Sequence, residues 1–416
     1  METVVKIDSG LIRGEKRDGL FVFKGIPYAS PPVGQLRWQP PRPPVPWEGT
    51  KECMNFGPGC PQLESPTGHG IPWDRTDEDC LSLNIWTPAA SSSDRLPVMV
   101  WIHGGAFVSG GSSFYLYDGA NLSKKGVVVV TINYRLGPFG FLFGNFGLMD
   151  QIAALKWVKK NISALGGDAD RTTIFGESAG AYCILRLMTS PLTEGLFQRA
   201  IIESGGHFGD RFWYPSPTTA NRSEQKAVKK IADALGCGQS GEVIECLRQR
   251  SAKEILEAAN PGIAFHAGKT PFGPTGPVGA LRDIPLIIGS NADEGNMFLQ
   301  KMSPVLRPLL NRVFTYTNFS RPAAQIVRDR EKKGISTYLY MFCRIPPTRP
   351  GKKLGSHHGA EINYVFGNLD PAEGFGDGDI ALSGSIMNYW TNFAATANPN
   401  REGLPVWPEK LQFVFR

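Results

Sequence analysis

One serine in this chain is surrounded by small residues between two periodic segments. The stretch "TTIFGESAGAYC" at residues 172–183 places Ser178 between an acidic residue and an alanine, with Gly176 and Gly180 two positions away. Residues 172–175 have strand character and the residues from Ala179 have helical character. A strand-to-helix turn this sharp brings both backbones close, so only glycine fits at 176 and 180. The pattern predicts a serine hydroxyl exposed at the end of a sheet, beside a helix N-terminus.

Strand and helix patterns alternate on both sides of this turn. Strands are expected at 97–102, 126–133, 172–175, 199–203, 284–290 and 336–343, and helices at 147–163, 179–189 and 380–397. Before about residue 95, Pro, Gly and Trp interleave with aromatic residues, which indicates ordered loops over short strands. Alternating strands and helices predict an α/β fold with a mostly parallel sheet covered on both faces. Active sites in such sheets lie beyond the carboxyl ends of the strands.

The chain is expected to form a single domain over residues 1–416. Its length exceeds that of a typical domain core, but large α/β enzymes often remain single. Two polar, helical segments, at about 206–280 and 296–335, interrupt the alternation. We expect these inserts to lie over the C-terminal ends of the strands and to shape a pocket.

Composition excludes several classes of function. The net charge of +6 is spread along the chain without a dense basic tract, which gives no support for nucleic-acid binding. The longest apolar run, at 126–133, is too short to span a bilayer. The start "METVVKIDSG" has no signal-peptide pattern, so any signal peptide is expected to have been removed or replaced. With six scattered histidines and neither C-x-x-C nor H-E-x-x-H, no metal or cofactor is expected.

A serine nucleophile needs a base, a group that orients the base, and donors for the oxyanion. "HGGAF" at 103–107 follows the strand at 97–102 and places the backbone N–H groups of Gly105 and Ala106 where they can face a ligand. In isolation this loop could be only a tight turn, and G-x-S-x-G only a glycine-rich connection. Together, in this order, they favour a catalytic site with the N–H of Ala179 as a third donor.

The acid and the base should follow the serine in that order along the chain. "NADEG" offers both Asp293 and Glu294 as the acid, and "GSHHGAE" offers both His357 and His358 as the base. His103 is interpreted as part of the oxyanion loop. The remaining histidines are interpreted as structural: His69, His207 and His266.

These motifs belong to longer stretches that resemble one family. The stretches are "FKGIPYASPPVGQLRW", "EDCLSLNIW", "VMVWIHGGAF", "NYRLGPFGF", "GLMDQIAALKWVKKNISALGGDADRTTIFGESAGA", "GLFQRAIIESG" and "HGAEINYVFG". They resemble type-B carboxylesterases, the cholinesterase-like branch of the α/β hydrolases. The resemblance implies Ser178 as nucleophile, Glu294 as acid and His358 as base. It also implies oxyanion donors, which fall on Gly105, Ala106 and Ala179.

The resemblance further implies two disulfides. Seven cysteines cannot be paired by spacing alone. The family's bridges match Cys60 with Cys80 and Cys237 with Cys246, which leaves three cysteines reduced: Cys53, Cys183 and Cys343. Such bridges imply an oxidising compartment, hence secretion or a periplasm.

The chain departs from the family pattern in two respects. Glu294 and His358 are only 64 positions apart, a span that is usually longer in the family, and the text at 268–285 also looks compressed. Either the lid-forming helices are short or residues are missing from the sequence. The aromatic cation site of cholinesterases has no match, because Trp73 lies at a different distance from Cys80, so choline esters are not predicted.

The expected function is hydrolysis of small-molecule carboxylic esters through an acyl-enzyme. The base is expected to titrate near the ordinary histidine value of about 6.5, raised by Glu294 and lowered by burial. One alternative is a catalytically silent adhesion or binding module, although such relatives typically lack the nucleophile. Another is an amidase, which would use the same triad. The sequence does not indicate the acyl group, the alcohol or the oligomeric state.

Overall fold

A ten-stranded sheet runs through the described part of the chain. The computed structural model describes residues 1–62, 71–205, 217–238, 242–259, 273–274, 279–409 and 411–416, with the side chains of 217–223 excepted. The strand order is β13-β12-β11-β10-β9-β7-β8-β6-β4-β3, and all pairs from β13 to β8 are parallel. The strands are β3 (Glu15–Arg17), β4 (Leu20–Pro27), β6 (Ser82–Thr87), β7 (Leu96–Ile102), β8 (Val128–Ile132), β9 (Gly167–Glu177), β10 (Arg199–Glu203), β11 (Leu286–Asn291), β12 (Thr337–Phe342) and β13 (Gln412–Phe415). The predicted α/β class is confirmed.

The N-terminal region forms short strands and ordered loops, as expected. A second sheet pairs β1 (Val4–Ile7), β2 (Gly10–Arg13) and β5 (Thr50–Glu52), and β3 and β4 join the main sheet in antiparallel orientation. The aromatic side chain of Trp38 is buried, and its indole donates to the carbonyl of Pro138.

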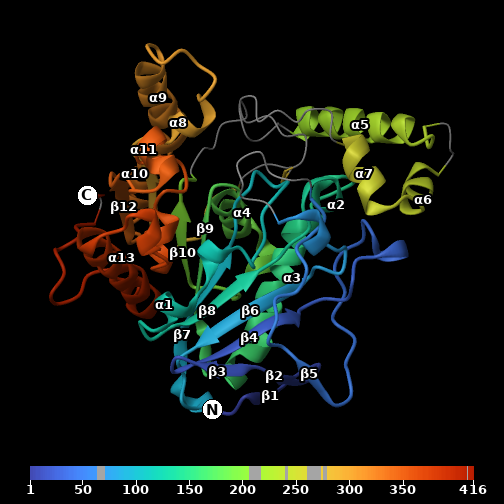
Figure 1. Cartoon of the computed structure of the whole chain (residues 1–416), viewed down its shortest axis with the longest axis horizontal. Helices are drawn as coiled ribbons and strands as arrows, with labels where there is room; N and C mark the ends of the chain where they lie inside the picture. Colours follow the sequence, from blue (N-terminus) through green and yellow to red (C-terminus); the bar gives the residue numbers. More distant parts are fainter. Residues whose placement is uncertain (63–70, 206–216, 239–241, 260–272, 275–278, 410) are drawn as a thin grey trace.

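Helices cover both faces of the main sheet (Figure 1). They are α1 (Ala120–Ser123), α2 (Gly137–Phe141), α3 (Phe146–Asn161), α4 (Ala179–Thr189), α5 (Pro217–Ala234), α6 (Val243–Arg248), α7 (Ala252–Ala259), α8 (Gly295–Phe298), α9 (Arg307–Thr315), α10 (Arg321–Glu331), α11 (Arg349–Leu354), α12 (Ile362–Phe366) and α13 (Asp377–Thr396). A single π-helical turn, Tyr316–Ser320, joins α9 to α10.

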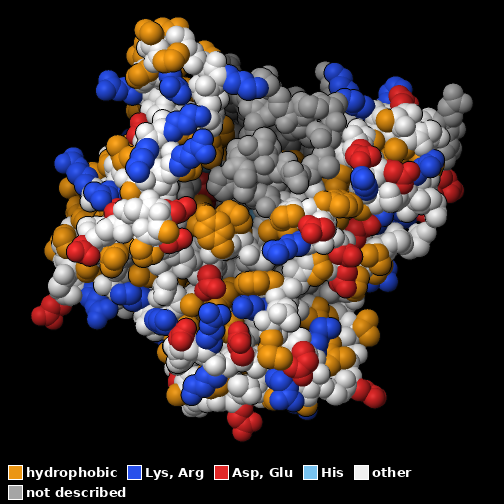
Figure 2. Space-filling view, in the orientation of Figure 1, with side chains coloured by type: hydrophobic (Ala, Val, Ile, Leu, Met, Phe, Trp, Pro, Cys, Tyr) orange, Lys and Arg blue, Asp and Glu red, His pale blue; other side chains and the backbone are white. Residues whose placement is uncertain are grey.

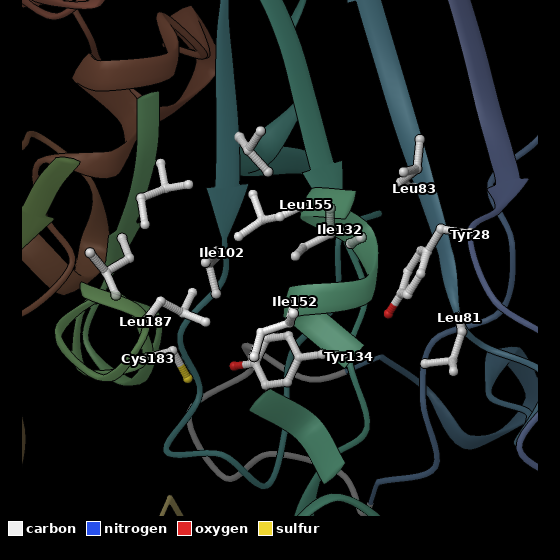
Figure 3. Packing of buried hydrophobic residues seen from close by; sticks show 14 of the residues in the cluster. Tyr28, Leu81, Leu83, Ile102, Ile132, Tyr134, Ile152, Leu155, Cys183 and Leu187 are labelled. Atoms are coloured by element: carbon white, nitrogen blue, oxygen red, sulfur yellow. The ribbon is translucent and has the colours of Figure 1, made fainter. Parts of the chain in front are cut away.

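The alternation of side chains along the central strands divides the core into two layers. In β7, Val98, Val100 and Ile102 belong to one apolar cluster, whereas Met99 and Trp101 belong to the other. The first cluster includes the inward faces of α3 and α4 (Figure 3), and the second includes α12 and α13. Strands buried on both faces read as continuous apolar runs, which is why the central strands were predictable.

Element boundaries differ from the predictions mainly at β9 and β13. β9 begins at Gly167, five residues before the expected strand, and an irregularity in its pairing with β7 lies between Leu96 and Val98. Its first residues, Gly-Asp-Ala-Asp, have low strand propensity, so pairing with β7 rather than local preference extends the strand. β13 was not predicted, because it is a four-residue strand at the sheet edge in which only Phe415 is buried.

Both predicted disulfides are present. Cys60 bonds to Cys80 and Cys237 to Cys246, while Cys53 and Cys183 are buried free thiols and Cys343 is a partly buried one. In the part of the chain that the structure describes, no helix is long and apolar enough to cross a membrane.

Candidate active site

Ser178 lies at the turn between β9 and α4 in a strained backbone conformation. Its φ is 54°, a value that L residues rarely adopt, and its N–H donates to the carbonyl of Glu203 at 3.0 Å. A Cβ at Gly180 would lie 1.9 Å from the carbonyl oxygen of Ile102, and one at Gly176 would lie 2.5 Å from the same oxygen. The two glycines are therefore required by the end of β7, the strand next to β9, as well as by the approach of strand and helix.

The serine, one histidine and one glutamate form a continuous hydrogen-bonded series. His358 Nε2 lies 2.7 Å from Ser178 Oγ, and His358 Nδ1 lies 2.5 Å from Glu294 Oε2. The other oxygen of Glu294 accepts a hydrogen bond from the N–H of Asn291 at 2.8 Å, which holds the carboxylate. The imidazole is thus held at Nδ1 and has Nε2 directed at the hydroxyl.

The neighbouring candidates make other contacts. Asp293 accepts hydrogen bonds from the Asn311 side chain at 2.9 Å and from the N–H of Ser356 at 3.0 Å, so it links helix α9 to the loop that precedes His357. His357 Nδ1 lies 2.9 Å from the carbonyl of His358. His69, His207 and His266 lie outside the described residues.

The loop after β7 lies directly against the serine turn. A Cβ at Gly104 would lie 2.8 Å from a carboxylate oxygen of Glu177 and 3.1 Å from Ser178 Cβ. Gly105, Ala106 and Phe107 all have positive φ, which folds the loop back so that the N–H groups of Val108 and Ser109 donate to the carbonyl of Gly105. A Cβ at Gly105 would lie 2.1 Å from the carbonyl oxygen of Ser109, so this turn requires glycine.

Further contacts hold this loop in place. The imidazole of His103 is buried and stacks on Tyr134, whose hydroxyl donates to the carbonyl of His103 at 2.8 Å. Burial lowers the pKa of His103 to about 4, so this imidazole is neutral. The Gln62 amide bonds to both the N–H and the carbonyl of Gly110, and so links the Cys60–Cys80 disulfide region to the loop.

Three further buried glutamates lie close to the series, and sequence reasoning did not single them out. Glu177 Oε1 lies 3.1 Å from His358 Nε2. Glu361 accepts hydrogen bonds from Asn291 and Ser204, and Glu203 accepts one from the Trp390 indole at 2.8 Å. We call Glu177, Glu203 and Glu361 the acidic floor. Each stands inside a motif quoted above, beside a residue with an evident role, but burial was the missing signal.

The acidic floor changes the electrostatics of the histidine. Burial lowers the pKa of His358, but the carboxylates of Glu177 and Glu294 outweigh burial and raise that pKa to about 9. Burial raises the pKa of Glu177 to about 8 and that of Glu361 to about 7, with repulsion among the carboxylates adding to both. Burial also holds the pKa of Glu203 well above its ordinary value. The pKa of His358 is therefore raised above the ordinary histidine value, and the pKa of each acidic-floor carboxyl is raised above the ordinary glutamate value.

Aromatic rings from the second insert enclose the histidine. The rings of Phe298 and Phe319 lie 5.2 and 5.4 Å from that of His358, centre to centre, and Phe314 packs against both phenylalanines. These rings exclude water from one side of the imidazole. Among the described residues, no group of His, Cys, Asp and Glu side chains could hold a metal ion.

Comparison with known proteins agrees with this geometry. The model of the carboxylesterase family matches residues 1–308 and 300–412. The chain is 36% identical to para-nitrobenzyl esterase of Bacillus subtilis (strain 168), over 97% of this chain and 92% of that protein. It is 34% identical to liver carboxylesterase 1F of Rattus norvegicus, over 93% and 84%. A solved PNB esterase superposes with a TM-score of 0.86 at 32% identity and covers 100% of this chain and 96% of that one.

The family model spans nearly the whole chain, and the serine turn, the glycine loop and the sheet have the arrangement that the sequence motifs predicted. The chain therefore belongs to the carboxylesterase family of the α/β hydrolases and is a carboxylic-ester hydrolase.

Proposed function

We propose that this enzyme cleaves esters through an acyl-enzyme formed on Ser178, with His358 as base and Glu294 as the acid that orients it. The observation that carries the proposal is the unbroken series from Ser178 Oγ through both ring nitrogens of His358 to Glu294, at 2.7 and 2.5 Å. A nucleophile, a base and an orienting group within hydrogen-bond reach are the expected signature of nucleophilic catalysis.

In the first half-reaction, Ser178 Oγ attacks the ester carbonyl carbon while its proton passes to His358 Nε2. The carbonyl oxygen becomes an oxyanion, for which the N–H groups of Gly105, Ala106 and Ala179 are the proposed donors. Ala179 is the first residue of α4, where backbone N–H groups have no partner within the helix. The C–O bond to the alcohol then breaks, and His358 returns its proton to the leaving oxygen.

In the second half-reaction, water attacks the acyl-enzyme and gives a proton to His358 Nε2. The tetrahedral species then breaks its bond to Ser178 Oγ, which takes the proton back and releases the carboxylic acid. Glu294 stabilises the imidazolium in both halves, because its carboxylate lies against Nδ1. No cofactor takes part in either step.

The proposal also covers the domain organisation of the chain and the compartment in which the protein works. We treat residues 1–416 as a single α/β-hydrolase domain in which the segments at about 206–280 and 296–335 shape the pocket. The contact of Phe298 and Phe319 with His358 supports this for the second segment. The two disulfides support secretion or a periplasmic location.

Replacement of the nucleophile tests the proposal. Ser178→Ala should lower kcat on p-nitrophenyl esters roughly 10⁴- to 10⁶-fold and leave the unfolding midpoint nearly unchanged. A Ser303→Ala variant, at an exposed position, serves as the control. Labelling with a fluorophosphonate should modify the wild type at Ser178 alone.

Substantial turnover in a verified Ser178→Ala preparation would contradict the mechanism. A p-nitroanilide measured beside the ester separates esterase from amidase activity. If the wild type hydrolyses neither the ester nor the anilide, the result would instead favour a catalytically silent adhesion or binding module. Acyl chains of increasing length on the same chromophore would then define the pocket.

A further inference from the structure

The segment that follows Glu294 carries apolar side chains on its outside. Within it, six large apolar residues have exposed side chains, out of nineteen such residues in the described part of the chain. Their exposed fractions are 43% for Met302, 85% for Val305, 54% for Leu306, 64% for Leu309, 52% for Val313 and 59% for Tyr316. We call this set the α9 face. Figure 2 shows hydrophobic side chains gathered at the end of the molecule where Figure 1 places α9.

These residues lie on one side of the helix. Leu309, Val313 and Tyr316 follow one another at spacings of four and three, and Val305 and Leu306 precede the first turn of α9. The α9 face is therefore continuous rather than a set of scattered side chains. Exposed apolar patches of this kind mark interaction sites in soluble proteins.

The opposite side of the helix carries two buried polar residues, Asn311 and Thr315, and the half-buried ring of Phe314. The Asn311 amide donates to Asp293 at 2.9 Å, Thr315 accepts from the N–H of Gly295, and the ring of Phe314 packs against those of Phe298 and Phe319. Polar and apolar contacts thus attach the inner side of α9 to the protein, while a second set of apolar side chains, the α9 face, meets solvent. The apolar residues of the α9 face are consequently not required by the core.

The charge around the α9 face has one sign. Residues 295–321 contain four basic side chains and no aspartate or glutamate: Lys301, Arg307, Arg312 and Arg321. Arg312 is exposed and lies within one turn of Leu309, Val313 and Tyr316. Basic side chains flanking an exposed apolar helix face are typical of helices that lie on anionic membrane surfaces.

The match to the family model is divided into two parts close to the start of α9. The two matches to the family model overlap at 300–308, which covers most of the connection between α8 and α9 and the first two residues of α9. The matched region with para-nitrobenzyl esterase runs over 465 residues, more than the 416 of this chain, so the relative carries residues that this chain lacks.

We propose that the α9 face docks this enzyme on an anionic lipid surface, with the apolar side chains at the acyl boundary and the basic side chains among the headgroups. A second copy of the chain is a poorer occupant, because a symmetric contact would bring like charges together without an acidic partner. Since Phe298 and Phe319 from the same segment contact His358, docking would place the site beside the lipid.

Vesicle sedimentation tests the proposal. The full chain should sediment with vesicles of phosphatidylcholine mixed with phosphatidylserine, more weakly with phosphatidylcholine alone, and more weakly at high salt. Leu309→Ser with Val313→Ser should lower partitioning by roughly tenfold for each residue. Arg312→Glu should lower it for the anionic vesicles only. The matched control is Val45→Ser with Val406→Ser, which changes two exposed valines elsewhere and should have no effect.

The outcomes are separate from those of the catalytic proposal. Ser178→Ala should bind vesicles as the wild type does, so loss of catalysis and loss of docking are measured in different variants. Absence of vesicle binding, or equal binding by wild type and α9-face variants, would overturn the proposal. It would also be overturned by a concentration-dependent dimer in sedimentation velocity that the α9-face substitutions abolish while vesicle binding is absent.

Discussion

The acidic floor and the α9 face depart in opposite directions from the rule that charges lie outside and apolar groups inside. In the acidic floor, carboxyl groups are buried, and each is matched by a group of this chain: His358 for Glu177, Trp390 for Glu203, and Asn291 for Glu361. In the α9 face, apolar groups are exposed, and the described residues supply nothing to cover them. The difference teaches that each buried carboxyl of the acidic floor has a polar group of this chain beside it, whereas the described residues leave the α9 face open to the lipid surface that we propose for it.

The largest expected effect concerns the histidine that adjoins the acidic floor. His358→Ala should lower kcat roughly 10³-fold or more, because Ser178 then has no base, whereas His357→Ala should keep most of the activity. Side-by-side kinetics of the two variants on one p-nitrophenyl ester provide the measurement. If His357→Ala is the inactive variant, the assignment of the base is wrong by one residue.

The next effect concerns the serine turn, which follows Glu177 of the acidic floor directly in the chain. Gly180→Ala should destabilise the protein by about 3 kcal/mol, since its Cβ would lie 1.9 Å from the carbonyl oxygen of Ile102. Gly384→Ala, inside α13 with no atom within 4 Å of the added Cβ, is the matched control and should be neutral or stabilise by roughly 0.5 kcal/mol. Urea unfolding of both variants gives the comparison. Equal stabilities would show that the serine turn tolerates a side chain there.

A smaller effect concerns the charge of the acidic floor. The base acts when His358 is neutral, so activity should fall as the pH drops through its pKa. Glu177 raises that pKa, which lies at about 9, because its carboxylate lies 3.1 Å from Nε2. Glu177→Gln should therefore move the acid limb of kcat/KM to lower pH, toward the ordinary histidine value of about 6.5.

Glu361→Gln provides the graded control for this experiment. Glu361 contributes less than Glu177 to the pKa of His358, so its substitution should move the limb in the same direction by less. If the acid limb of kcat/KM stays at the same pH in Glu177→Gln, the Glu177 carboxyl carries no charge over the pH range in which His358 titrates.

The smallest effects compare the two sides of α9. Asn311→Ala should destabilise the protein by about 1–2 kcal/mol, because Asp293 then loses a buried donor. Leu309→Ser, two residues away on the exposed side, should change stability by less than about 0.5 kcal/mol in the absence of lipid. Urea unfolding again provides the measurement. A large loss in Leu309→Ser would show that the α9 face belongs to the core after all.

Much of the site could be predicted because local sequence and chain order both restrict it. Gly176 and Gly180 beside Ser178, and Gly105 in the loop at 103–107, are required because a Cβ there would collide with backbone carbonyls. The central strands could be predicted because they are apolar runs buried on both faces of the sheet. The choice of Glu294 over Asp293 and of His358 over His357 came from family resemblance, since adjacent residues of like chemistry carry no local signal for direction.

By itself, the amino-acid sequence determined the serine turn, the α/β alternation and the order of serine, acid and base, because each depends on residue size or spacing along the chain. Only the tertiary structure decided how Glu177 and Glu361 come to act on one histidine and how Glu203 lies close enough to repel both, since the three come from separate segments and their raised pKa values arise mainly from burial. It also decided the orientation of α9. The spacing of the apolar residues predicts a helix face, but the hydrogen bonds of Asn311 and Thr315 turn that face toward solvent.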